Sequence, residues 1–293
     1  MTMRQQHADY QVAPYQKLRQ FSVDMYRSVR HKPLMHGLIE VDVTRARAAL
    51  RVHKAQTGES LSFTAFLSTC LAKAVDEHKA VQAFRKGKKQ LVLFKDVDIL
   101  ARIERDVGGE KYVMPYVIRA ANRKTVRQIH NEIRAAQLVD MRHMLTQFWY
   151  LPTMLFKPFI WTFAEIGKRR PQLGKKFFGT VGITSVGMFG AGPGWGIPPA
   201  MPTALMLTVG GIGEKQVMVD GHPAVREYLS LTISIDHDLV DGAPAARFTQ
   251  RLKALIESGY GLDLGNTTTD SEQTPRSREV NHVYTGVRES SIG

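Results

Sequence analysis

A histidine between a predicted strand and a predicted helix is the residue in this sequence best suited to acid–base chemistry. Residues 229–235 (LSLTISI) alternate apolar and polar side chains, which predicts a strand with one buried face. The helix that follows carries its apolar side chains on one side: Phe248, Leu252, Leu255 and Ile256. His237 lies in the short polar connection between them. Because an imidazole titrates near neutral pH, a histidine held between two rigid elements can accept a proton from a nucleophile.

Two more residues of this connection have candidate roles. Asp241 would orient the loop or hold His237, and Gly242 would permit a tight turn. His237 and Asp241 could both bind a metal, but two ligands do not make a site and no third candidate stands out. The sequence therefore does not favour a metal site. His36 could also face the site, but its spacing alone does not show this.

The segment SIDHDLVDGAPAARF resembles the His-x-x-x-Asp-Gly active-site motif of the dihydrolipoyl acyltransferases of 2-oxo acid dehydrogenase complexes. The related chloramphenicol acetyltransferases carry the same motif. Asp236 before the motif and Gly-Ala-x-Ala-Ala-Arg-Phe after it also match. The resemblance covers residues 15 to about 262. It implies an α/β fold like that of chloramphenicol acetyltransferase, with a mixed sheet flanked by helices and assembly into homotrimers.

The resemblance also implies roles for particular residues. In the family the motif histidine deprotonates the thiol of coenzyme A or dihydrolipoamide without a covalent acyl-enzyme, which assigns His237 as the base. Thr184, in GITSVG, aligns with a hydroxyl that donates to the oxyanion, and in the family this hydroxyl comes from a different subunit of the trimer. Arg19 matches an arginine that pairs with the motif aspartate, here Asp241; a solvated Arg19 is the alternative.

Contacts to coenzyme A are expected from three of these positions: Ser185, Gly242 and Arg19. Two departures from the family pattern suggest altered acceptor binding. Asp238 replaces the usual arginine after the histidine, and Val186 stands near a position where asparagine is frequent.

Residues 141–170 depart further from the family and hold two of the three tryptophans. Pro152, Lys157 and Pro158 interrupt the apolar runs, which are too short to span a bilayer as one helix. Three hypotheses remain for this insertion: a helical hairpin packed on the core or on another subunit, an interfacial membrane contact next to its basic flank, or a lid over a hydrophobic acyl site.

Composition is ordinary for a globular protein, with 43% hydrophobic residues among 293. The formal net charge of +13 fits the phosphates of coenzyme A as well as nucleic acid, for which no recognition motif is present. Cys70 lies in an apolar helical stretch and is expected in the core. The polar start has no signal-peptide pattern, so a cytoplasmic location is the default expectation.

The predicted organisation is a flexible arm at residues 1–13, a catalytic domain at residues 14–262, and a polar, disordered tail at residues 263–293. The sequence contains no lipoyl-lysine segment. We therefore expect a coenzyme A-dependent acyltransferase that uses a dihydrolipoamide-like thiol or another nucleophile, serving lipoyl domains or dehydrogenase subunits in trans. The alternatives are a non-catalytic trimeric scaffold of a larger assembly and a membrane-associated protein using residues 141–170.

Overall fold

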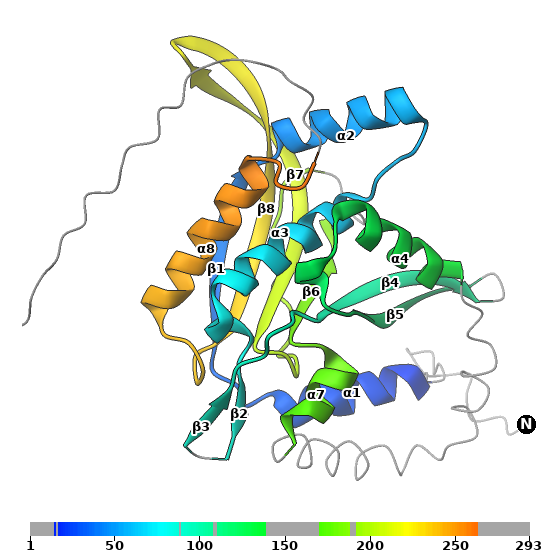
Figure 1. Cartoon of the computed structure of the whole chain (residues 1–293), viewed down its shortest axis with the longest axis vertical. Coiled ribbons are helices and arrows are strands. Elements are labelled where there is room, and N and C mark those ends of the chain that lie inside the picture. The colour runs from blue at the N-terminus through cyan, green and yellow to red at the C-terminus, as the bar shows by residue number, and fades with distance from the viewer. Residues whose placement is uncertain are drawn as a thin grey trace, which may run out of the picture.

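One curved mixed sheet with helices on both faces forms the body of the protein (Figure 1). The computed structural model describes residues 15, 17–87, 89–107, 110–138, 170–187 and 192–262. The predicted arm, the predicted tail and all but the last residue of the predicted insertion lie outside the described residues. Within the described part of the chain, no helix is long and apolar enough to cross a membrane.

The sheet has six strands in the order β1-β8-β7-β6-β4-β5. β6 runs parallel to both of its neighbours, and the other pairs are antiparallel, so the sheet is mixed as predicted. A separate two-stranded hairpin consists of β2 and β3. The bounds of the strands are β1 Leu34–Asp42, β2 Phe84–Lys86, β3 Gln90–Val92, β4 Ile99–Val107, β5 Glu110–Ile118, β6 Val181–Ser185, β7 Leu205–Val219 and β8 His222–Asp236.

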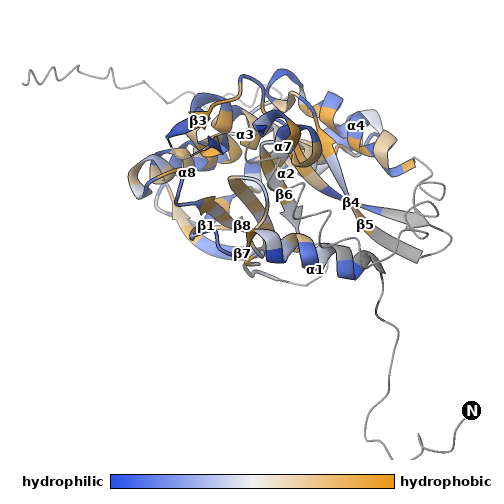
Figure 2. Ribbon diagram, turned by 90° about the horizontal axis from the view of Figure 1, so that it is seen from below, coloured by the Kyte–Doolittle hydropathy of each residue, from blue (hydrophilic) through white to orange (hydrophobic). Residues whose placement is uncertain are grey.

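Helices α3, α4 and α8 cover one face of the sheet, while α1 lies on the other side (Figure 2). The main core fills the space beneath the first group, where Phe66 of α3 and Phe248 of α8 are fully buried. Burying a side chain of this size contributes about 2–3 kcal/mol. Cys70 is buried there too, which confirms its predicted place and raises the pKa of its thiol. The helices are α1 Lys17–Val29, α2 Thr44–Thr57, α3 Phe63–Glu77, α4 Val126–Leu138, α7 Pro171–Phe178 and α8 Gly242–Glu257, with short 3-10 turns at Lys79–Gln82 and Ala121–Arg123.

The polar side chains of β8 are buried as deeply as its apolar ones, so the prediction of one buried face is wrong. Ser230, Thr232, Ser234 and Asp236 are at most 4% exposed. Residues 192–204 lie over this face: Gly194 N donates to Ser230 Oγ (3.3 Å), and α1 packs against the same side through Met25 and Tyr26. The alternation reports only that two faces differ in polarity, whereas burial depends on distant segments that cover them.

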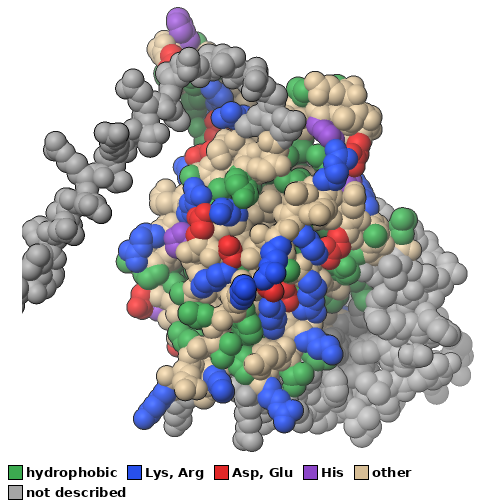
Figure 3. Space-filling view, viewed as in Figure 1, with side chains coloured by type: hydrophobic (Ala, Val, Ile, Leu, Met, Phe, Trp, Pro, Cys, Tyr) green, Lys and Arg blue, Asp and Glu red, His purple; other side chains and the backbone are tan. Residues whose placement is uncertain are grey.

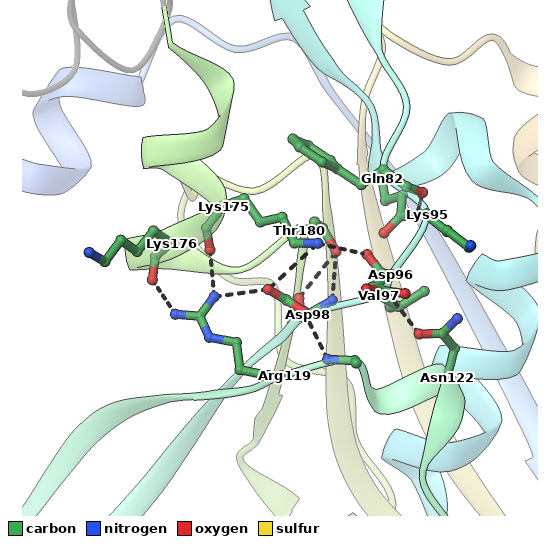
Figure 4. Close-up of polar contacts among 12 residues, drawn as sticks. Gln82, Lys95, Asp96, Val97, Asp98, Arg119, Asn122, Lys175, Lys176 and Thr180 are labelled. Atoms are coloured by element: carbon green, nitrogen blue, oxygen red, sulfur yellow. Dashed lines mark hydrogen bonds and ion pairs between the residues drawn. The ribbon is translucent and has the colours of Figure 1, made fainter.

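A buried aspartate anchors the start of β4 to α7 (Figure 4). Asp98 accepts hydrogen bonds from Arg119 Nη1 (2.9 Å) and Ala120 N (2.9 Å), and its backbone exchanges hydrogen bonds with Thr180. Arg119 also donates to the carbonyl oxygens of Lys175 and Lys176 at the end of α7. Several hydrogen bonds thus satisfy this buried carboxylate, and they fix where β6 enters the sheet.

Candidate active site

The loop that carries His237 is built as the sequence predicts. β8 ends at Asp236, and Leu239 N and Val240 N both donate to Asp236 O (3.1 and 3.2 Å), closing a tight turn. Val240 is buried and fixes the far side of the turn. His237 is exposed, and its backbone N–H donates to Pro33 O (2.8 Å). The imidazole is therefore accessible, on a backbone that is tied at both ends.

An ion pair between the partly buried Lys32 and the buried Asp236 lies at the base of this loop. Lys32 Nζ is 3.1 Å from Asp236 Oδ2, and it also donates to Pro202 O (3.3 Å) and Thr203 O (3.0 Å). Asp236 Oδ1 accepts from Asp238 N (3.2 Å). Because a buried charge is costly without its partner, this arrangement holds the base of the His237 loop in place. Sequence reasoning missed Lys32, because nothing in the local pattern links it to a residue some 200 positions away.

Helix α8 follows the loop and is fixed to α3. Its predicted apolar residues are buried, and Gly259 just past its end has a positive φ of 69°. Arg251 of α8 forms a two-point ion pair with Glu77 of α3, with N–O distances of 2.5 and 3.0 Å. Hydrogen bonding to Arg251 lowers the pKa of Glu77 to about 2, against the opposing effect of burial. The helix that follows the His237 loop is therefore held firmly against α3.

Asp241 and Gly242 begin this helix, and their roles at the site stay predictions. Asp241 is the N-terminal cap of α8, but its side chain makes no capping hydrogen bond. Arg19 is exposed on α1, and the described residues contain no ion pair between Arg19 and Asp241. Gly242 is the first helical residue, without a positive φ, and an added Cβ would meet nothing within 4 Å. Neither backbone conformation nor space within one chain therefore requires glycine there.

The predicted hydroxyl donor lies on β6, in a row of residues that crosses four strands. Thr184 pairs with Thr208, Thr208 with Thr232, and Thr232 with Leu38, so the four side chains share one face. Thr208 and Thr232 are buried, and their hydroxyls have no hydrogen-bond partner among the described residues. Thr184 itself is half-buried. Thr208 and Thr232, unlike Thr184, were not predicted as site residues, although the polar positions of residues 229–235 signalled part of the row.

Close backbone contacts shape the rest of this region. A Cβ on Gly187 would lie 1.8 Å from Gly210 O, and one on Gly211 would lie 1.9 Å from Gly192 O. β7 has a register irregularity between Val209 and Ile212 at the same place. Ser185 is half-buried at the end of β6, and its neighbour Val186 is 43% exposed. Only glycine allows these segments to approach so closely, which explains the glycine-rich sequence here.

One chain does not bring His237 and Thr184 together. Thr184 lies two strands from Thr232 of β8, and His237 lies five residues beyond Thr232. At about 3.3 Å per residue and about 4.8 Å per strand, the two are roughly 15 Å or more apart. His237 and Thr184 therefore cannot contact the same atom within a single chain.

Another histidine lies on this polar face. His36 is exposed, and its Nδ1 is 2.8 Å from Ser234 Oγ, on the strand that leads to His237. Among the described residues, no group of three or more His, Cys, Asp or Glu side chains is arranged to hold a metal ion.

The sequence profile of the family described as 2-oxoacid dehydrogenases acyltransferase (catalytic domain) matches residues 7–143 and 174–262. The chain belongs to this family. The sequence is 28% identical over 240 residues to the lipoamide acyltransferase component of the branched-chain alpha-keto acid dehydrogenase complex of Bacillus subtilis, covering 80% of this chain and 49% of that protein. The chain thus spans about half the length of the curated relatives it matches.

Solved structures of related acyltransferase cores confirm the predicted fold. The cubic core of the pyruvate dehydrogenase multienzyme complex superposes with a TM-score of 0.62 at 22% identity, covering 88% of this chain and 95% of that chain. Azotobacter vinelandii dihydrolipoamide acetyltransferase gives the same TM-score and coverage at 23% identity. The prediction of a mixed sheet flanked by helices, made from the motif around His237, is therefore correct.

Proposed function

We propose that this protein is a coenzyme A-dependent acyltransferase that moves an acyl group between a coenzyme A thioester and a thiol of the dihydrolipoamide type, or another nucleophile. The observation that carries the proposal is the placement of His237, exposed on a rigidly tied loop, in a chain of the acyltransferase catalytic-domain family. The Bacillus subtilis relative is named a lipoamide acyltransferase component. The Azotobacter vinelandii structure comes from work on a serine, a histidine and an asparagine in its catalytic mechanism.

His237 acts as the general base in this proposal. Its imidazole takes the proton of the attacking thiol, and the thiolate forms a new C–S bond to the thioester carbonyl carbon. Thr184 donates its hydroxyl to the carbonyl oxygen as negative charge develops there. The old C–S bond then breaks, and the imidazolium returns the proton to the departing thiolate. No acyl group is attached to the protein at any stage.

Assembly into homotrimers, or multiples of trimers, completes this site. Because His237 and Thr184 lie far apart in one chain, the proposal pairs His237 of one copy with Thr184 of the next. Contacts of Ser185, Gly242 and Arg19 with coenzyme A, partner dehydrogenase subunits or lipoyl domains in trans, and a cytoplasmic location stay predictions.

The test is acyl-coenzyme A turnover with dihydrolipoamide, measured as acyl-dihydrolipoamide and free coenzyme A separated by chromatography, for the wild type and His237→Ala. We expect activity to fall by about 10² or more, the scale of a lost general base. His222→Ala is the matched control, because His222 is also an exposed histidine but begins β8, at the opposite end of that strand from His237. Coenzyme A binding without turnover would mean that the acceptor is wrong. If the protein shows no coenzyme A binding and no turnover, the acyltransferase proposal is refuted and the non-catalytic scaffold is the alternative that stands.

A second experiment tests the shared site. His237→Ala and Thr184→Ala chains, each almost inactive alone, are co-expressed in equal amounts. If each site combines His237 of one copy with Thr184 of the next, random assembly restores about a quarter of the wild-type activity. If both residues act within one chain, every site lacks one of them and no activity returns.

A further inference from the structure

The β2–β3 hairpin carries a concentrated run of positive charge. Residues 84–95 read FRKGKKQLVLFK, with five basic residues and no acidic one. Arg85, Lys86 and Lys89 are exposed. In the space-filling view, Lys and Arg side chains project from the lower end of the molecule, where this hairpin lies (Figure 3).

This hairpin lies beside the His237 loop. Arg85 Nη1 is 3.8 Å from Asp238 Oδ2, and both side chains are more than half exposed. Figures 1 and 2 place the hairpin next to the N-terminal end of α8, where that loop ends. A molecule bound to the hairpin therefore lies next to the histidine half of the proposed site. Asp238 is also the residue that replaces the usual arginine of the family motif.

The charges on this hairpin are largely unbalanced. Among the described residues, Lys86 and Lys89 have no carboxylate within ion-pair distance. Within that part of the chain, Arg85 pairs only with the Asp238 carboxylate, at the long distance of 3.8 Å. Water screens an exposed pair of this kind, so it does not hold Arg85 tightly. The result is a positive field that attracts anionic partners.

Apolar side chains accompany the cations. Leu91 is 49% exposed and Leu93 is 58% exposed. Leu91 pairs with Arg85 across the hairpin, so both side chains project from the same face. Exposed leucines among basic residues suit a protein interface, which combines an apolar centre with a charged rim. Small phosphorylated ligands instead favour concave sites, whereas this hairpin projects from the body (Figure 1).

We propose that the hairpin face, formed by Arg85, Leu91 and Leu93 on one side of the hairpin together with Lys86 and Lys89 beside its turn, docks an acidic carrier protein that brings its tethered thiol or acyl group to His237. This inference rests on the proposed function, because the carrier supplies the thiol substrate. Complementary charge speeds association with such a carrier, and the leucines add contact area once it is docked. The charge of the hairpin face thus selects the carrier, while the His237 loop performs the chemistry.

The test uses the double variant Lys86→Glu/Lys89→Glu in the full chain. The probes are a lipoyl domain with an acidic face around its lipoyl-lysine, and the same domain with those carboxylates changed to amides. Free dihydrolipoamide and coenzyme A serve as small substrates. Arg45→Glu/Lys54→Glu is the matched control, since it makes the same change of charge at two exposed residues of α2, away from the His237 loop.

At low ionic strength we expect kcat/KM with the acidic dihydrolipoyl domain to fall about 10-fold or more in the hairpin variant, and Kd to rise by a similar factor. Turnover of free dihydrolipoamide and KM for coenzyme A should not change. The control variant and the neutralised domain should show little effect. Added salt should reduce the difference.

Three results would overturn the inference. One is unchanged binding of the acidic domain by the hairpin variant, and another is an equal loss in the control variant. The third is a rise in KM for coenzyme A that matches the loss with the domain, which would assign the hairpin to coenzyme A phosphates. If the wild type turns over no substrate, the proposed function fails, and the Kd measurement still decides whether the acidic domain docks here.

Discussion

Replacing Lys32 by methionine is expected to destabilise the protein by about 3 kcal/mol. Methionine keeps much of the aliphatic length of lysine but removes its charge. The Asp236 side chain is only 6% exposed, and the substitution leaves its carboxylate with Asp238 N as its remaining hydrogen-bond donor among the described residues. Removing one partner of a buried pair costs about 3–5 kcal/mol, and the 22% exposure of Lys32 places the estimate at the lower end.

The assay is urea denaturation at a fixed protein concentration, because assembly makes stability depend on concentration. Lys215→Met is the control: its pair with Glu40 is exposed, so its loss should cost less than about 1 kcal/mol. The double variant Lys32→Met/Asp236→Asn, which removes both charges, should be less destabilised than the two single changes added together. Equal costs for Lys32→Met and Lys215→Met, or strict additivity in the double variant, would refute the reasoning.

Two further predictions concern glycine packing and pH. Gly211→Ala places a Cβ 1.9 Å from Gly192 O and should lower the free energy of unfolding by about 2 kcal/mol, measured by thermal unfolding. Gly194→Ala is the control and should be nearly neutral, because its added Cβ meets nothing within 4 Å. Equal losses of stability in the two variants would contradict this explanation. Burial, helped by nearby arginines, lowers the pKa of His130, whose Nδ1 accepts from Ser62 N. The unfolded chain then binds the proton more readily, so stability falls as pH drops below about 6.5. The His130→Asn variant should show a smaller fall between pH 7 and 5 in denaturant titrations, and an unchanged slope would refute the assignment.

Local patterns in the sequence were enough to place the elements around His237. The strand before it, the turn and the helix after it each follow from side-chain periodicity within a few residues, and the buried set from Phe248 to Ile256 is the one predicted. The motif around His237 also led to the family and the mixed sheet. Short-range periodicity suffices here because burial of one helix face depends mainly on spacing along the chain.

Tertiary structure decided what surrounds these elements. The Lys32–Asp236 pair and the burial of Ser230 and Thr232 under residues 192–204 both depend on distant segments. Strand register decided the rest. The sequence proposed His237 and Thr184 as site residues, but the pairing of β6, β7 and β8 sets how far apart they lie. Periodicity carries no information about register between distant strands, so only the folded sheet shows that these two candidates are well separated within one chain.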